Sequence, residues 1–179
     1  MLIQKTCNTY ARVFCSILSG ILFLGLLFGS THAFPSLDKE LHSIELQIDN
    51  PFMNVDGVSM KIDPLSEAAP IIVPSWKRSM IPLRGVLEHM GTTIEWVAEE
   101  KKITIYKEQT STEIVLYIDQ PKALVQGDTC WIDEENHRVA PFIVDKRAYI
   151  PVLFVGKTLR AKVTWYPKNK FISIQWTDK

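Results

Sequence analysis

Histidine and cysteine are the residues of this chain best suited to binding a transition metal. Past residue 33 the histidines are His42, His89 and His137, and none lies two or four residues from another, the spacing that turns two imidazoles toward one ion. Cys130 has no second cysteine beside it to complete a soft metal site. We predict no metal site and no cofactor, and we interpret His89 and His137 as solvated side chains.

Acidic and nucleophilic residues give no catalytic pattern either. The run Asp133-Glu134-Glu135-Asn136 lacks the glycine-punctuated oxygen spacing of a calcium loop, so it is interpreted as a solvated turn. Serine, histidine and aspartate are all present, but no motif for an activated nucleophile is found. The sequence therefore predicts no catalytic residue.

Five tryptophans are the remaining candidates for ligand contacts, because their flat faces can stack on sugars. Trp96 and Trp165 share a face with neighbouring isoleucines, so we predict that they pack in the core. Trp76 lies beside Pro74 and Ser75 in a predicted loop, where it would be exposed. It is the one candidate for a partner contact. The patterns around Trp131 and Trp176 leave their roles undecided.

An internal repeat determines how these residues are positioned. Residues 44–51 return seventy positions later as residues 114–121, and Lys77 to Pro82 return as Lys146 to Pro151. The spacing drifts by one or two residues in the predicted loops, where insertions are tolerated. We predict a first copy at 44–107 and a second copy at 112–179.

Each copy shows strand and helix patterns in the same order. Apolar and polar residues alternate from Ile44 to Asp49, as in a half-buried strand, and Asp56-Gly57 indicates a tight turn. After Pro82, apolar residues recur at helical spacing until Gly91, which is suited to end a helix. The predicted class is α+β, with two tandem copies of an antiparallel sheet, each packed on one short helix. Whether the copies are separate units or exchange strands is left open.

The first 33 residues have the pattern of a signal peptide. Lys5 and Arg12 precede an apolar run that is shorter than most membrane-spanning helices, and Thr31-His32-Ala33 offers a cleavage site. We expect cleavage before Phe34, no stable membrane span afterwards, and a linker at 34–43. The alternative is an uncleaved anchor. Cys15 follows Phe14 rather than a small residue, which argues against lipid attachment.

Charge and cysteine content limit the partners of the mature chain. Of 20 Lys and Arg, Lys5 and Arg12 leave with the signal, so 18 remain against 20 Asp and Glu. A slightly acidic balance argues against nucleic acid as a partner. Cys130 is then the single cysteine, which excludes an intramolecular disulfide. We interpret it as a small buried hydrophobe, with a reactive thiol or an intermolecular bridge as the alternatives.

The order of these motifs resembles a known family. Ala69-Pro70, an apolar strand, a polar turn, Ile81-Pro82-Leu83-Arg84, a short helix and a tryptophan-containing hairpin are similar to the copper amine oxidase N-terminal-like domain. That family occurs in secreted and surface proteins of Gram-positive-type bacteria. The resemblance implies a five-stranded antiparallel sheet around a helix, which forms a stalk remote from the catalytic domain. Leu153 and Arg160 of the second copy depart from Arg84 and Gly91 of the first.

The resemblance implies no catalytic, metal or cofactor residue, because the family assigns none to this domain. Amine oxidation would also need a quinone-forming tyrosine in an Asn-Tyr-acidic context, which the tyrosines lack. We predict a non-catalytic interaction or scaffolding module, secreted or at the cell surface, that binds another envelope protein or a wall polymer. The alternative is a secreted regulator or a small-ligand or carbohydrate-binding protein. A carrier would need a pocket of ~300 Å³ or more.

Overall fold

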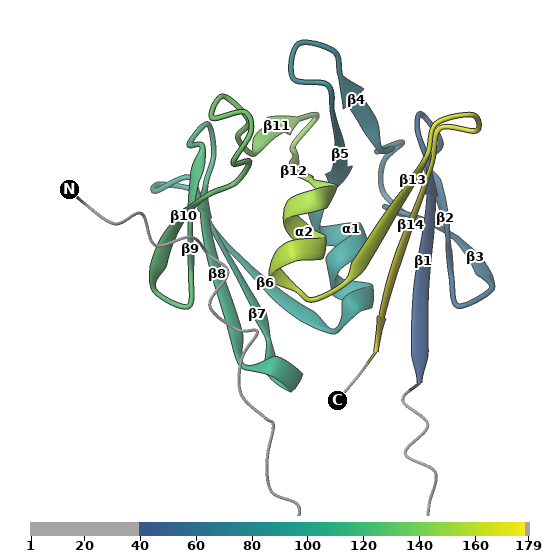
Figure 1. The fold of residues 1–179 in the computed structure, drawn as a ribbon, viewed down its shortest axis with the longest axis horizontal. Coiled ribbons are helices and arrows are strands. Elements are labelled where there is room, and N and C mark those ends of the chain that lie inside the picture. The colour runs from purple at the N-terminus through teal and green to yellow at the C-terminus, as the bar shows by residue number, and fades with distance from the viewer. Residues whose placement is uncertain (1–39, 178–179) are drawn as a thin grey trace, which may run out of the picture. The chain divides into compact units, whose positions relative to one another are not determined.

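The computed structural model describes residues 40–177, which belong to one compact unit, 39–179. Figure 1 shows three antiparallel sheets and two short helices, so the described chain is mostly β. The predicted antiparallel sheets and short helices are confirmed, but the helical share is smaller than the α+β prediction implied. The signal peptide and all but the end of the predicted linker lie outside the described residues.

The first sheet combines both ends of the described chain. Its strand order is β13-β14-β1-β2-β3, and β1 pairs with β14 along its whole length, from Leu41↔Thr177 to Gln47↔Phe171. The strand that was predicted to begin at Ile44 therefore begins three residues earlier. The strands are β1 (Leu41–Gln47), β2 (Phe52–Val55), β3 (Val58–Lys61), β13 (Lys162–Tyr166) and β14 (Phe171–Thr177).

The second sheet is formed from the middle of the chain. Its order is β10-β9-β8-β7-β6, and the 3-10 turn η2 (Glu108–Thr110) links β7 to β8. The strands are β6 (Thr92–Val97), β7 (Lys102–Lys107), β8 (Thr112–Tyr117), β9 (Lys122–Val125) and β10 (Asp128–Trp131). Both five-stranded sheets thus contain strands from 44–107 and from 112–179. Each of these sheets is therefore built from strands of both halves of the described chain.

The third sheet has four strands in the order β11-β12-β5-β4, and it leads into the helices. Pro82 ends β5 (Arg78–Pro82) and precedes α1 (Leu83–Leu87), while Pro151 ends β12 (Arg147–Pro151) and precedes α2 (Val152–Thr158). Proline suits a helix start because its missing N–H is not needed there. The edge strands are β4 (Ile71–Val73) and β11 (Phe142–Val144).

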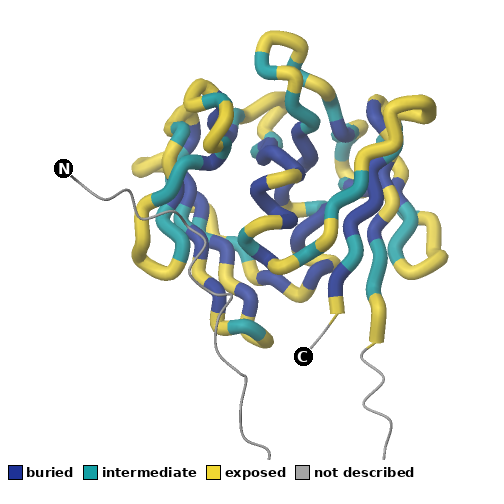
Figure 2. Tube along the Cα trace, viewed as in Figure 1, coloured by how far each residue is buried: buried dark blue, intermediate teal, exposed yellow. Residues whose placement is uncertain are grey.

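The core lies where the helices meet the inner faces of the strands. Figure 2 shows buried residues on both helices and along the strands, with exposed residues at the turns. Ile44 and Leu46 of β1, and Ile114 and Leu116 of β8, are fully buried. Their polar neighbours point outward, as the alternating pattern predicted. After α1, the turn η1 (Glu88–Met90) ends at Gly91 with φ of 72°, which confirms the predicted helix end.

Candidate functional site

Two apolar grooves are the candidate binding sites. The first groove has a volume of about 690 Å³. It is lined by Leu83 and Gly85 of α1, by Ile94 and Trp96 of β6, and by Ile143 of β11. Gly85 has room for no side chain, because a Cβ would lie 2.1 Å from the carbonyl oxygen of Ile62.

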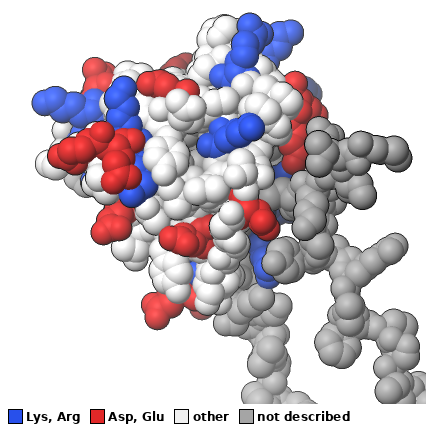
Figure 3. Space-filling model, turned by 90° about the vertical axis from the view of Figure 1, so that its left-hand side faces the viewer, with Lys and Arg blue, Asp and Glu red and all other residues white. Residues whose placement is uncertain are grey.

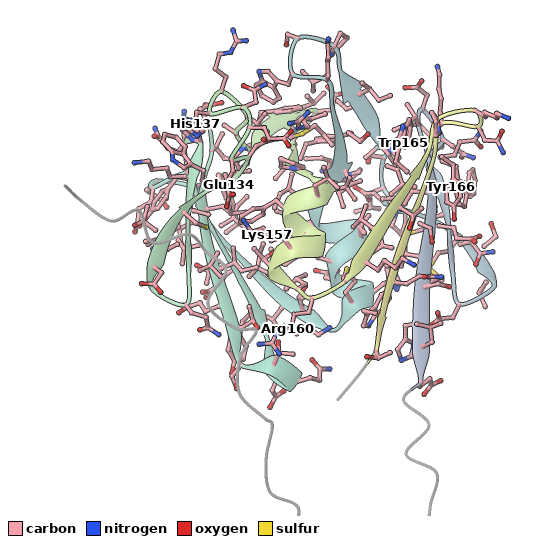
Figure 4. The ribbon with its side chains drawn as sticks, in the orientation of Figure 1. Glu134, His137, Lys157, Arg160, Trp165 and Tyr166 are labelled. Carbon is pink, nitrogen blue, oxygen red and sulfur yellow. The ribbon has the colours of Figure 1, made fainter. Side chains whose placement is uncertain are left out.

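The second groove has about 320 Å³ and is formed by corresponding parts of the chain. Val152 and Leu153 of α2, Trp165 of β13 and Ile72 of β4 line it. Figure 4 shows Trp165 and Tyr166 on β13, on the side of α2 away from Glu134. Each groove therefore joins a helix start, an edge strand that carries a tryptophan, and an edge of the third sheet.

The tryptophans in the grooves correct one sequence prediction. Trp96 and Trp165 were expected to be packing residues, yet each keeps 39% of its surface exposed. They do share a face with Ile94 and Ile103, or with Val163 and Ile172, but that face leaves the core and becomes a groove wall. The edge position of β6 and β13 explains this, since no further strand covers them.

A lysine stands at the rim of each groove. Lys146 occupies the turn between β11 and β12, and Lys77 the turn between β4 and β5. Both have left-handed backbone conformations, with φ of 64° and 54°, which residues other than glycine seldom adopt. Within residues 40–177 neither ammonium group has a carboxylate within ion-pair distance. Each groove is thus lined by one tryptophan and by one lysine that has no ion-pair partner among the described residues.

The arginine that follows each lysine is bound to an aspartate. Arg147 donates from Nε to Asp63, which also accepts hydrogen bonds from the backbone of Leu65, at 2.9 Å, and from the Ser66 hydroxyl. The Arg147 bond is the main reason that the pKa of Asp63 is lowered from 3.8 to about 2. The same pairing raises the pKa of Arg147. The loop after β3 is therefore tied to β12.

Arg78 makes the corresponding contact with Asp133. Arg78 donates to both oxygens of Asp133 and also to Glu135, at 2.9 Å, and the backbone of Glu135 and Asn136 donates to Asp133. Burial alone would raise the pKa of Asp133, but these bonds outweigh it and lower that pKa. The interpretation of 133–136 as a fully solvated turn is wrong for Asp133. The acidic run 133–136 gave no signal in the sequence for this long-range pair.

Trp76, the predicted partner contact, is not the exposed loop residue that we expected. It is partly buried, packs against the core and meets the ring of Phe142 edge-on, with centroids 5.8 Å apart. Phe142 in turn stacks on Tyr149. Trp76, Phe142 and Tyr149 thus form an aromatic cluster. Its role in partner contact stays a prediction, and it lines neither groove.

Trp131 and Trp176, whose roles the sequence left undecided, each stack on a histidine ring. Trp176 is buried and stacks on His42, which also bonds to Asp56 at 2.8 Å. Trp131 stacks on His137 with centroids 3.8 Å apart, while the Lys122 ammonium lies 4.6 Å from the same ring. His89 is exposed, as predicted, and Cys130 is partly buried against the core.

The residues that the structure describes assemble neither a metal site nor a membrane-spanning helix. No group of three or more histidine, cysteine, aspartate or glutamate side chains within 40–177 is placed to hold a metal ion. No helix in this part of the chain is long and apolar enough to cross a membrane. On the side of β9 and β10, Figure 3 shows acidic and basic groups interspersed among uncharged side chains, without a patch of one sign.

These features define a β-rich domain with two apolar grooves. A family comparison identifies the domain: the model of the copper amine oxidase N-terminal domain matches residues 54–174. The chain belongs to that family, as the motifs indicated. The matched domain is a non-catalytic one, and no catalytic domain of the amine oxidases is detected. Searches of curated proteins and of solved structures found no match.

Proposed function

We propose that this protein is a non-catalytic interaction module that binds another molecule outside the cell or in the cell envelope through its grooves. The observation that carries the proposal is the exposed face of Trp96 in an apolar groove that is also lined by Lys146, a lysine without an ion-pair partner among residues 40–177. Exposed aromatic side chains next to an unpaired charge are typical of binding surfaces. The family match to a non-catalytic domain supports it.

We further propose that residues 44–107 and 112–179 are two copies of one motif that share their sheets. The matched order of elements, the two proline helix starts and the two arginine–aspartate pairs support this proposal. Shared sheets would hold the two grooves in a fixed relation, which suits a scaffold that contacts a partner at two points.

The second candidate is a carrier of a small ligand or carbohydrate. The first groove exceeds the ~300 Å³ that such a carrier needs. However, the carboxylates and guanidinium groups of its lining, which could bond sugar hydroxyls, are already engaged, since Asp63 is bound to Arg147 and Arg84 lies 3.6 Å from Glu88. This pairing favours an interaction module.

The test compares envelope fractions incubated with the mature protein, with Trp96→Ala and with Trp165→Ala. We expect a retained component that is lost with at least one substitution. The same preparations are titrated with Cu(II) by calorimetry and assayed for hydrogen peroxide with simple primary amines. A stoichiometric copper site of submicromolar affinity, or peroxide above background, would overturn the non-catalytic proposal.

Export is a proposal that needs its own test. The basic head, the apolar run and Thr31-His32-Ala33 support cleavage before Phe34 and a secreted or surface location in a Gram-positive-type bacterium. Mass spectrometry of secreted protein should give an amino terminus at Phe34. A chain that begins at Met1 in the membrane fraction would favour the anchor instead.

A further inference from the structure

The first groove lies against a free sheet edge, and this edge determines what can bind there. β6 is the last strand of the second sheet and pairs only with β7, from Thr92↔Lys107 to Val97↔Lys102. Its other edge makes no ladder within residues 40–177. The strand contains no proline, and its single charged residue is Glu95. It therefore lacks most of the devices that usually protect an edge strand.

The side chains of β6 determine which surface the side chains of an added strand would contact. Ile94 and Trp96 point into the first groove, while Thr93 and Glu95 point to the outer face. A strand paired with β6 would place every second side chain on the face of Ile94 and Trp96. Those side chains would enter the groove and contact apolar walls, including Ile143, which is 45% exposed, and Leu65, which is 89% exposed.

The charges at the groove specify one further property of the occupant. Arg147 is bound to Asp63, and Arg84 lies 3.6 Å from Glu88, four residues further along the chain. Lys146 is left as the charge without a partner among the described residues, and it lines the same groove. An acidic side chain on the groove face of the added strand would complement it.

We propose that the first groove binds an extended peptide segment of a protein partner, added as a strand to the free edge of β6. Apolar side chains at alternate positions fill the groove, and a carboxylate reaches Lys146. Backbone hydrogen bonds give affinity in this mode, while the alternate pockets give specificity. The inference rests on the proposed interaction function and names the partner class. A glycan is disfavoured because the carboxylates of the groove, Asp63 and Glu88, already face Arg147 and Arg84.

The experiment begins with a displayed library of random heptapeptides selected on the mature protein. We expect enrichment of sequences with β-branched or aromatic residues at alternating positions and an acidic residue in the same phase. An enriched peptide is then synthesised for calorimetry, beside a scrambled peptide of equal composition. Trp96→Ala should weaken binding about tenfold or more, whereas Trp165→Ala, equally exposed in the second groove, should leave it within about twofold.

Two further measurements separate strand addition from simple apolar contact. Methylation of the peptide backbone nitrogens that pair with β6 should weaken binding about tenfold, because it removes ladder hydrogen bonds. Lys146→Glu should weaken binding of the acidic peptide, and a lysine in place of the peptide carboxylate should restore it. Circular dichroism and unfolding curves confirm that each variant is folded.

The results distinguish this inference from the broader function. Absence of any enriched peptide, or binding unaffected by backbone methylation or by Trp96→Ala, would overturn strand addition. If an envelope glycan is instead retained through Trp96, the interaction function stands and the peptide inference fails. If copper binding or amine oxidation appears, the interaction function itself fails.

Discussion

The two grooves are assembled from corresponding segments, yet the first has about twice the volume of the second. Trp96 and Trp165 are equally exposed, and Lys146 and Lys77 share a left-handed turn position. The difference lies in the loops after β3 and β10. Asp63, Pro64 and Leu65 line the first groove, whereas no residue of 132–139 lines the second.

One ion pair links the loop after β10 to α2. Lys157 of α2 donates to Glu134 in the loop after β10, and Figure 4 shows these labelled residues close together. At the corresponding positions of the first region stand Glu88 and Pro64, which cannot form that pair. The two grooves therefore share their helix start, edge strand and sheet edge, and they differ in size because of the contacts of one loop.

A second difference is the helix residue that faces the loop. Gly85 lets α1 lie directly on the carbonyl of Ile62, while the residue 69 positions later, Phe154, is large and buried. The first region therefore brings helix and loop backbones together. The second fills the same place with an aromatic ring.

The largest expected effect comes from Gly85→Ala. Its methyl group would meet a backbone carbonyl, which cannot rotate away, so we expect the free energy of unfolding to fall by about 3 kcal/mol. Urea unfolding measures the change. Leu153→Ala, on the exposed surface of α2, is the control and should cost under about 0.5 kcal/mol. An unchanged midpoint for Gly85→Ala would contradict the close approach of α1 and Ile62.

Loss of either arginine–aspartate pair should lower the free energy of unfolding by less than Gly85→Ala does, and by different amounts for the two pairs. Asp133→Asn is expected to lower the free energy of unfolding by about 1.5 kcal/mol and Asp63→Asn by about 1 kcal/mol. Asp133 is the less exposed carboxylate, with a side-chain exposure of 10% against 14%. Thermal unfolding at neutral pH compares the two variants. A larger loss for Asp63→Asn would reverse our ranking.

Acid titration sharpens the same comparison. A carboxylate whose pKa is lower in the folded chain stabilises the fold above its unfolded pKa, and this contribution is lost as pH falls through the folded pKa. For Asp63 the window runs from about 3.8 to about 2. The stability difference between the wild type and Asp63→Asn should be constant above about pH 5 and should vanish near pH 2. A difference that persists below pH 2 would show that the carboxylate charge is not its source.

Substitutions at the two helix ends should change the free energy of unfolding in opposite directions. Arg160 has φ of 56° where Gly91 has 72°, so both are left-handed and only glycine avoids the steric cost. Arg160→Gly should raise the free energy of unfolding by about 1 kcal/mol, and Gly91→Arg should lower it by a similar amount. Differential scanning calorimetry of both variants checks this. A stability loss in Arg160→Gly would mean that the arginine side chain makes a stabilising contact.

The smallest effect is expected for Glu134→Gln. The pair with Lys157 is about half exposed on both sides, so its loss should cost no more than about 0.5 kcal/mol. Glu88→Gln, which affects only the contact with Arg84, is the matched control. Salt titration of the unfolding midpoint compares them. A cost of several kcal/mol for Glu134→Gln would make this pair a main determinant of the fold.

Much of the local structure was predictable because it depends on local chemistry. Alternation around Ile44 and Ile114 indicated half-buried strands, Pro82 indicated a helix start, and Gly91 indicated its end, as the structure shows. The motifs also led to the right family. These features require only neighbours along the chain, whose propensities and periods are written in the sequence.

The pairing of strands and the site were decided by the tertiary structure. Periodicity shows which face of β6 is apolar, but not that β6 is an edge, so Trp96 was taken for a core residue. Trp76 was expected in solvent, yet Phe142, 66 residues away, covers it in part. Asp133 gave no sign of its bond to Arg78. The sequence by itself determined the elements and the family, whereas edges, grooves and ion pairs depend on contacts between distant segments, which no local pattern encodes.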